Sequence, residues 1–162
     1  MARRRIEVQP ISSLEDALGY KFKNQNLLRQ ALTHPTAVTE RHPDAFKHDL
    51  TVLAFIGDAV LKYSVARYLF LNGQMDLTAN RAQMHEGVQK IISNRVLGEI
   101  GEEKLHLEQY LIRGNSIQNV NMNVYADCVE AILGAIALDC EVGGQERIFP
   151  VIEKICFDRI EH

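Results

Sequence analysis

Three carboxylates stand inside two strongly apolar segments of the chain, where an unpaired charge would be costly. Asp58 lies within Leu53–Leu61, and Asp127 and Glu130 lie within Tyr125–Ile136. A carboxylate among apolar side chains must be paired, protonated or bound to a metal. Asp127 and Glu130 are three residues apart, so they share one face of a helix. If the two segments pack together, Asp58 joins them, and a divalent cation would relieve the repulsion among the three acids.

The same acids also have an ordinary structural interpretation. Asp58 could pair with Lys62 or Arg67 across a helical turn. Asp127 and Glu130 could form a salt-bridged or half-exposed helix face. The sequence alone leaves both interpretations open.

Composition places the chain among ordinary globular domains. Its 162 residues are 46% hydrophobic and 24% charged, enough for one domain with a core. A net charge of −3 does not indicate a separate basic nucleic-acid-binding module. No run approaches the ~18 apolar residues that would span a membrane. Three cysteines without a Cys-x-x-Cys pair favour a reducing, cytoplasmic setting over a disulfide framework or a thiolate zinc site.

Caps and apolar periodicity predict an all-α fold. Residues 1–10 carry Arg3-Arg4-Arg5 and are expected to form a flexible arm, followed by one domain over 11–162. Ser12, Asn24 and Asp76 are expected helix N-caps. Helices are expected at about 12–18, 25–33, 49–71, 77–92, 94–99, 105–112, 124–139 and 146–160. Residues 35–47 and 113–123 are expected to be loops, and His34, before Pro35, is expected to be structural.

Two glycines interrupt the helices that carry the acids. Gly57 and Gly134 each cost ~1 kcal/mol relative to alanine inside a helix, so a packing reason is expected. Glycine lets two helix axes approach closely. Such an approach would bring Asp58 towards the Asp127 and Glu130 face.

Three segments resemble the ribonuclease III family. Leu53-Ala54-Phe55-Ile56-Gly57-Asp58-Ala59-Val60 resembles its signature helix, N-E-R-L-E-F-L-G-D, and Tyr125–Ala131 resembles its motif A-D-x-V-E-A. Leu18–Phe22 followed by Leu27–His34 resembles the opening of the family domain, which ends in A-L-T-H. Order and spacing agree along almost the whole chain, so the combined match is specific. The resemblance implies an all-α, ribonuclease III-type helical endonuclease domain, without the double-stranded-RNA-binding domain of the ordinary family.

The chain departs from the family pattern at three acidic positions. Family glutamates fall on Thr51, Ala54 and Gln74, while Asp58, Asp127 and Glu130 remain. A compact branch, the mini-ribonucleases III, also lacks the RNA-binding domain and resembles this chain in the alanine of its signature. Members of that branch act on ribosomal RNA precursors.

By resemblance, Asp58, Asp127 and Glu130 would hold Mg²⁺ or Mn²⁺, with Asp58 and Glu130 catalytic. Hard carboxylate oxygens suit both ions. The missing carboxylate at Ala54 leads us to expect a higher metal requirement, with a preference for Mn²⁺.

The resemblance also implies a homodimer that acts on double-stranded or structured RNA. Phe55 matches an aromatic residue that lies at the dimer contact in the family, although it could instead be ordinary core. Double-stranded RNA is read mostly by shape, phosphate and 2′-hydroxyl contacts. The sequence does not place the candidate RNA-binding cations on one face; they are Lys62, Arg67, Arg81, Lys90, Arg95 and Arg113.

Two further interpretations compete with the enzyme. A degenerate member of the family could bind double-stranded RNA or a ribosomal particle as a non-cleaving scaffold, which the absent glutamates favour and the three retained acids oppose. A helical metal-binding domain without an RNA role is the third, and the collinear match opposes it.

Overall fold

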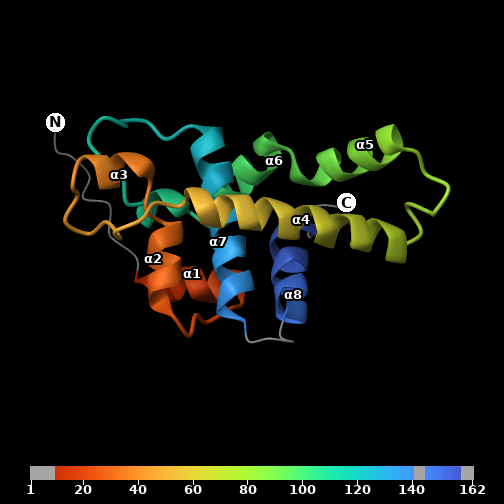
Figure 1. Ribbon diagram of the computed structural model, residues 1–162, viewed down its shortest axis with the longest axis horizontal. Coiled ribbons are helices and arrows are strands. Elements are labelled where there is room, and N and C mark those ends of the chain that lie inside the picture. Colours follow the sequence, from red (N-terminus) through yellow and green to blue (C-terminus); the bar gives the residue numbers. More distant parts are fainter. Residues whose placement is uncertain (1–9, 141–144, 158–162) are drawn as a thin grey trace.

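The structure, a computed structural model, describes residues 10–140 and 145–157 and is all-α, as predicted (Figure 1). The arm over residues 1–9 and the expected end of the last helix at 160 lie outside these ranges, so the predicted division into arm and domain stays a prediction. The helices are α1 (Ile11–Leu18), α2 (Gln25–Ala31), α3 (Pro35–Thr39), α4 (Thr51–Leu71), α5 (Arg81–Ile92), α6 (Asn94–Glu99), α7 (Met122–Asp139) and α8 (Ile148–Ile152).

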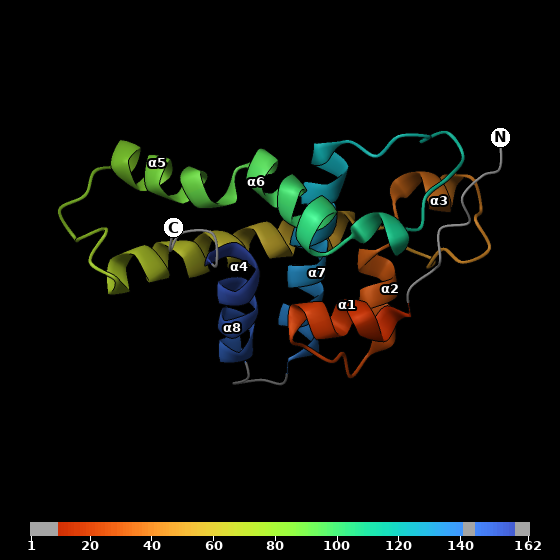
Figure 2. The same ribbon diagram turned by 180° about the vertical axis from the view of Figure 1, so that it is seen from behind.

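Helices α4 and α7 form the centre of the molecule and make the most extensive contact of any pair. Helix α4 runs along the long axis, and α7 crosses it with α1 and α2 on one side and α8 on the other (Figures 1 and 2). Helices α5 and α6 lie along α4, and α6 also packs on α7. Most side chains of α7 are buried, because neighbours cover it on several sides. This explains why its apolar residues are not confined to one stripe.

Side-chain caps set several helix boundaries. The Asn24 side chain caps α2 as predicted, by accepting a hydrogen bond from the backbone N–H of Asn26. The prediction of Ser12 as a cap is wrong: α1 begins at Ile11 after Pro10 and ends at Gly19, where φ is +71°. Glycine adopts this left-handed conformation without strain.

The start of α5 also differs from the prediction. Asp76 does not cap a helix; its carboxylate accepts hydrogen bonds from the backbone N–H and hydroxyl of Thr78 in a turn. Asn80 caps α5 instead, in a reciprocal pair with Gln83. A reciprocal capping box satisfies two backbone donors, which fixes the helix start at Arg81.

The segment predicted to be a loop over residues 35–47 contains the short helix α3. Pro35 occupies its first turn, and the Nδ1 atom of His34 accepts a hydrogen bond from the Thr36 backbone N–H. His34 therefore has the expected structural role, at the beginning of a helix. Helical geometry in the expected 105–112 helix is limited to a 3-10 turn at Leu107–Gln109.

None of the helices in the described ranges combines the length and the apolar character that crossing a bilayer requires. The three cysteines are free thiols; Cys128 and Cys156 are buried and Cys140 is half-buried.

Candidate active site

Helices α4 and α7 touch backbone to backbone at Gly57 and Gly134. A Cβ atom at Gly57 would lie 1.7 Å from the carbonyl oxygen of Glu130, and one at Gly134 would lie 2.0 Å from that of Leu53. Neither position has room for a side chain. The prediction of a close approach at these glycines is confirmed, and it sets Asp58 beside the turn that carries Glu130.

Glu130 lies within electrostatic range of both Asp58 and Asp127 at this crossing. Burial, and after it the Asp58 and Asp127 carboxylates, together raise the pKa of Glu130 to about 7. Burial also raises the pKa of Asp127 above its ordinary value. Burial and the acidic neighbours therefore keep Glu130 partly protonated near neutral pH.

Asp58 has a cationic partner within the same helix. The Nζ atom of Lys62 lies 2.7 Å from Oδ2 of Asp58, and the side chains are 54% and 39% exposed, respectively. Arg67, the other partner considered from the sequence, lies instead over the Phe149 ring, with its Cζ atom 4.7 Å from the ring centroid. The ion pair and the acid cluster coexist, so the structural and functional interpretations of Asp58 do not exclude each other.

The donor chemistry suits a hard divalent cation, but the side chains are not preassembled around one. In the described part of the chain, no three histidine, cysteine, aspartate or glutamate side chains are placed to surround one ion. Carboxylate oxygens are nevertheless the ligands that Mg²⁺ and Mn²⁺ prefer. An ion that binds Asp58 through Oδ2 would displace the Lys62 ammonium from that oxygen.

His34 lies closer to the acids than the sequence indicated. Burial lowers its pKa, while the Asp127 and Asp49 carboxylates act in the opposite direction. The ring also pairs with the hydroxyl of Thr36, at 2.8 Å from Nδ1. Nothing in the spacing of His34 and Asp127 along the chain indicates this proximity, which arises from the packing of α2 on α7.

The three positions that lack a family acid differ in their distance from the cluster. Ala54 is half-buried one turn before Asp58, and Thr51 is exposed a turn further towards the N-terminus of α4. Gln74 follows the far end of α4, and 13 residues of helix at ~1.5 Å per residue separate Asp58 from Leu71. Only the first two substitutions therefore fall near the acids of the same chain.

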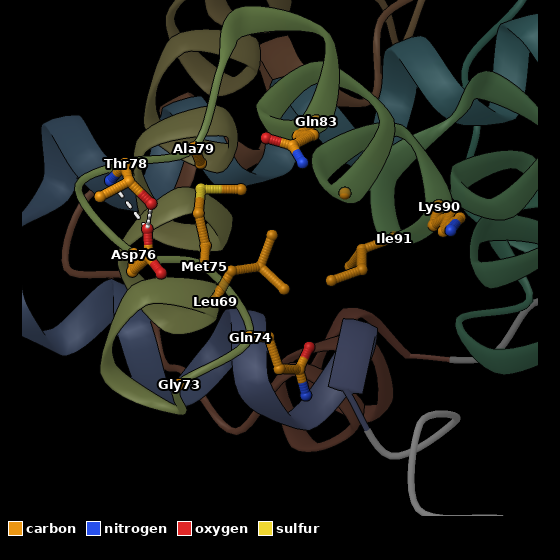
Figure 3. A pocket seen from close by; sticks show the side chains of 11 residues that line it. Leu69, Gly73, Gln74, Met75, Asp76, Thr78, Ala79, Gln83, Lys90 and Ile91 are labelled. Atoms are coloured by element: carbon orange, nitrogen blue, oxygen red, sulfur yellow. Dashed lines mark hydrogen bonds between the residues drawn. The ribbon is translucent and has the colours of Figure 1, made fainter.

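Gln74 instead borders a separate hollow of about 600 Å³ between the end of α4 and α5 (Figure 3). Leu69, Met75 and Ile91 contribute apolar side chains to it, while Gln83 and Lys90 lie at its α5 side. The polar groups of this hollow include no cluster of acids. We assign it no role in the chemistry.

Phe55 is not a core residue. Its side chain is 79% exposed on α4. Val52, Phe55 and Tyr63 are all exposed and follow one another at helical spacing, so they form an apolar stripe on α4. The structure therefore removes the alternative of Phe55 as ordinary core.

Most of the candidate RNA-binding cations are engaged with acids or rings. Lys90 pairs with Glu86 at 3.0 Å, and Arg95 pairs with Glu99 at 3.5 Å. Arg113 is half-buried, 3.8 Å from Glu108. Exposed pairs of this kind are weak and exchange easily, and the RNA-binding role of these cations stays a prediction.

The raised pKa of Glu130 predicts a pH-dependent stability. The folded protein holds this proton with a pKa of about 7, against 4.5 for the ordinary group, so the fold loses stability as pH rises from about 4.5 through 7. Glu130→Gln removes the charge. After a discount for partial exposure, we expect a gain of about 1–2 kcal/mol at pH 8, or about 3–6 °C in Tm, and almost none at pH 4.5.

Thermal unfolding in chelator at both pH values measures this difference. Glu86→Gln, an exposed acid on α5, is the matched control and should change Tm little at either pH. An equal gain at both pH values would mean that packing, not charge, explains the effect.

Comparison with known proteins agrees with this geometry. The family profile of the ribonuclease III domain matches residues 51–141. Ribonuclease 3 of Sinorhizobium fredii is 33% identical over 150 residues, which cover 90% of this chain and 58% of the relative. Ribonuclease 3 of Carboxydothermus hydrogenoformans is 29% identical, with 96% and 65% covered. The chain thus spans less than two thirds of the length of these relatives.

Solved structures give the same result. The nuclease domain of ribonuclease III from Campylobacter jejuni superposes with a TM-score of 0.78 at 25% identity, over 95% of this chain and 98% of that domain. A second structure of that nuclease domain, described for flexibility in a region involved in dimer formation, gives 0.73 at 28% identity over 90% and 98%. The matched segment contains both helices that carry the acids, α4 and α7. The chain therefore belongs to the ribonuclease III domain family.

Proposed function

We propose that this protein is a metal-dependent endoribonuclease that cleaves double-stranded or structured RNA as a homodimer. The observation that carries the proposal is the crossing at Gly57 and Gly134, where Glu130 lies within electrostatic range of both Asp58 and Asp127. The family of the chain supports the same function. A role in ribosomal RNA maturation fits the alanine at position 54, which resembles the mini-ribonucleases III.

Metal binding and proton transfer would both fall to the acidic groups of the site. A bound Mg²⁺ or Mn²⁺ would supply an activated water and stabilise the charge on the leaving oxygen. Asp58, Asp127 and Glu130 would hold the ion through carboxylate oxygens. Glu130, with a pKa of about 7, is also suited to accept or return a proton near neutral pH.

The exposed stripe of Val52, Phe55 and Tyr63 supports self-association. A side chain as large as phenylalanine that is 79% exposed is costly in water unless a partner covers it. A hollow of about 470 Å³, lined in part by Val38, His48 and Val52, lies at the N-terminal end of the same stripe. The dimer would place two acid clusters on one particle, so that each strand of a duplex could meet one.

Cleavage of a long double-stranded RNA by the purified protein, in Mg²⁺ and separately in Mn²⁺, tests the proposal. We expect cutting that leaves 5′-phosphates and short 3′ overhangs, with Mn²⁺ more effective than Mg²⁺ at equal concentration. Single-stranded RNA of the same sequence is the control substrate. The absence of cutting in either metal would contradict the enzyme.

A non-cleaving scaffold is the second candidate, and one observation favours it. Lys62 already partly neutralises Asp58, and Ala54 supplies no carboxylate one turn earlier. With Asp58 paired in this way, the fold would tolerate the acids without a metal. A gel shift with double-stranded RNA, in a protein that cuts in neither metal, would move the assignment to the scaffold.

Restoring a carboxylate at position 54 should strengthen the site. Ala54→Glu places an acid one turn before Asp58, on the same ridge of α4. We expect Mn²⁺ to bind about tenfold tighter and cleavage in Mg²⁺ to increase. Ala54→Gln, which adds the same bulk without the charge, is the control. No gain in a folded Ala54→Glu protein would indicate that this chain has built its metal site from other residues.

A further inference from the structure

On one face of α4, Asp58 stands between two residues that are not acids. Ala54, Asp58 and Lys62 follow one another at four-residue spacing, so they lie one above the other on the helix. Asp58 is thus flanked by a methyl group on one side and an ammonium on the other. Among the acids of the cluster, it is the one with a short ion pair, 2.7 Å to Lys62.

The charge of Lys62 acts on the cluster beyond its direct partner. The same ammonium lowers the pKa of Glu130, against the larger effect of burial, so it lies within electrostatic range of a second acid. Arg67, two helical turns beyond Asp58, is held over the Phe149 ring. Burial lowers the pKa of His34, the group beside Asp127. Among the residues that the structure describes, Lys62 is therefore a cation whose charge acts on an acid of each helix, Asp58 on α4 and Glu130 on α7.

We propose that Lys62 is an internal competitor for the divalent metal, which occupies the Asp58 carboxylate and thereby sets a weak metal affinity. This inference rests on the proposed metal site, and it adds a cause of weak binding that is separate from the missing acid at Ala54. An ion at Oδ2 of Asp58 must displace the ammonium, and an ion at Oδ1 would still be repelled by its nearby positive charge. The lysine side chain is 54% exposed and has four flexible carbons, so it can swing into solvent without disturbing the core.

The size of the effect follows from the charges involved. A unit positive charge a few ångströms from a divalent cation is repulsive even at high dielectric, and its removal should tighten binding by about threefold to tenfold. The gain should shrink as salt concentration rises, because the pair is exposed. A purely structural i, i+4 pair would have no such influence on metal affinity.

Calorimetric titration of Mn²⁺ into the RNA-free protein at low ionic strength tests the inference. Lys62→Gln should lower the Kd by about threefold to tenfold, while Lys62→Arg, which keeps the charge, should bind about as weakly as the wild type. Lys90→Gln is the matched control, because Lys90 forms the same i, i+4 pair with Glu86 on α5 at 3.0 Å. It should leave the Kd unchanged.

The outcomes separate this inference from the proposed function. If the wild type binds Mn²⁺ in a manner that Asp58→Asn abolishes, and Lys62→Gln binds no tighter, then Lys62 does not compete and the inference alone is wrong. If neither protein shows saturable binding that depends on Asp58, the metal site itself is refuted, and the inference with it. Binding that appears only in Lys62→Gln would be the strongest support.

Discussion

Asp58→Asn is expected to lower the rate of RNA cleavage on the order of a thousandfold or more, with the fold and self-association unchanged. The substitution keeps the shape of the side chain and removes the charge that would hold a metal. Its cost to stability should be small, because the lost pair with Lys62 is exposed and worth about 0.3–0.5 kcal/mol. Glu130→Gln is expected to lose cleavage to a similar extent.

The combination of lost activity and unchanged or higher stability is the result that identifies a functional acid. Glu130→Gln should unfold at a higher temperature than the wild type at pH 8 while it fails to cut. Structural acids behave in the opposite way, because their removal leaves partners unpaired. The wild type, Asp58→Asn and Glu130→Gln are compared by their initial cleavage rates in Mn²⁺, by thermal unfolding and by sedimentation velocity. Retained cleavage in folded Asp58→Asn would sink the assignment of the metal site.

Gly57→Ala is expected to destabilise the fold by about 3 kcal/mol or more. The new Cβ atom would lie 1.7 Å from the carbonyl oxygen of Glu130 and 2.5 Å from its carbonyl carbon. Both are backbone atoms of α7, so no side chain can rotate away, and the helices must separate. Gly134→Ala should behave in the same way, because it meets the carbonyl oxygen of Leu53 at 2.0 Å.

Gly87→Ala provides a matched control in the middle of α5. Its Cβ atom would meet only the ends of two flexible side chains, Leu69 Cδ1 at 3.3 Å and Met75 Cε at 3.4 Å. Alanine is favoured over glycine in a helix by about 1 kcal/mol, so we expect a neutral or stabilising change. Urea unfolding of the three variants measures the differences. A loss at Gly57 no greater than at Gly87 would mean that α4 and α7 separate more easily than their contact implies.

The helices themselves were largely predictable, because their determinants are local. Apolar periodicity fixed α4 and α7 to within a few residues, and Asn24 capped α2 as expected. One of the errors lies where two local signals compete. Asp76 and Asn80 both suit an N-cap, and the reciprocal partner Gln83 decides in favour of Asn80.

The sequence by itself determined the acids, the glycines and the order of the elements, since these follow from residue type and spacing along one chain. Only the tertiary structure decided that Phe55 is exposed, that Gln74 is remote from the cluster, and that His34 lies near Asp127. The tertiary structure also decided that Lys62, and not Arg67, is the partner of Asp58, because Phe149 of α8 supplies the ring that holds Arg67. Such contacts join residues far apart in the chain, and no periodicity within a single helix encodes them.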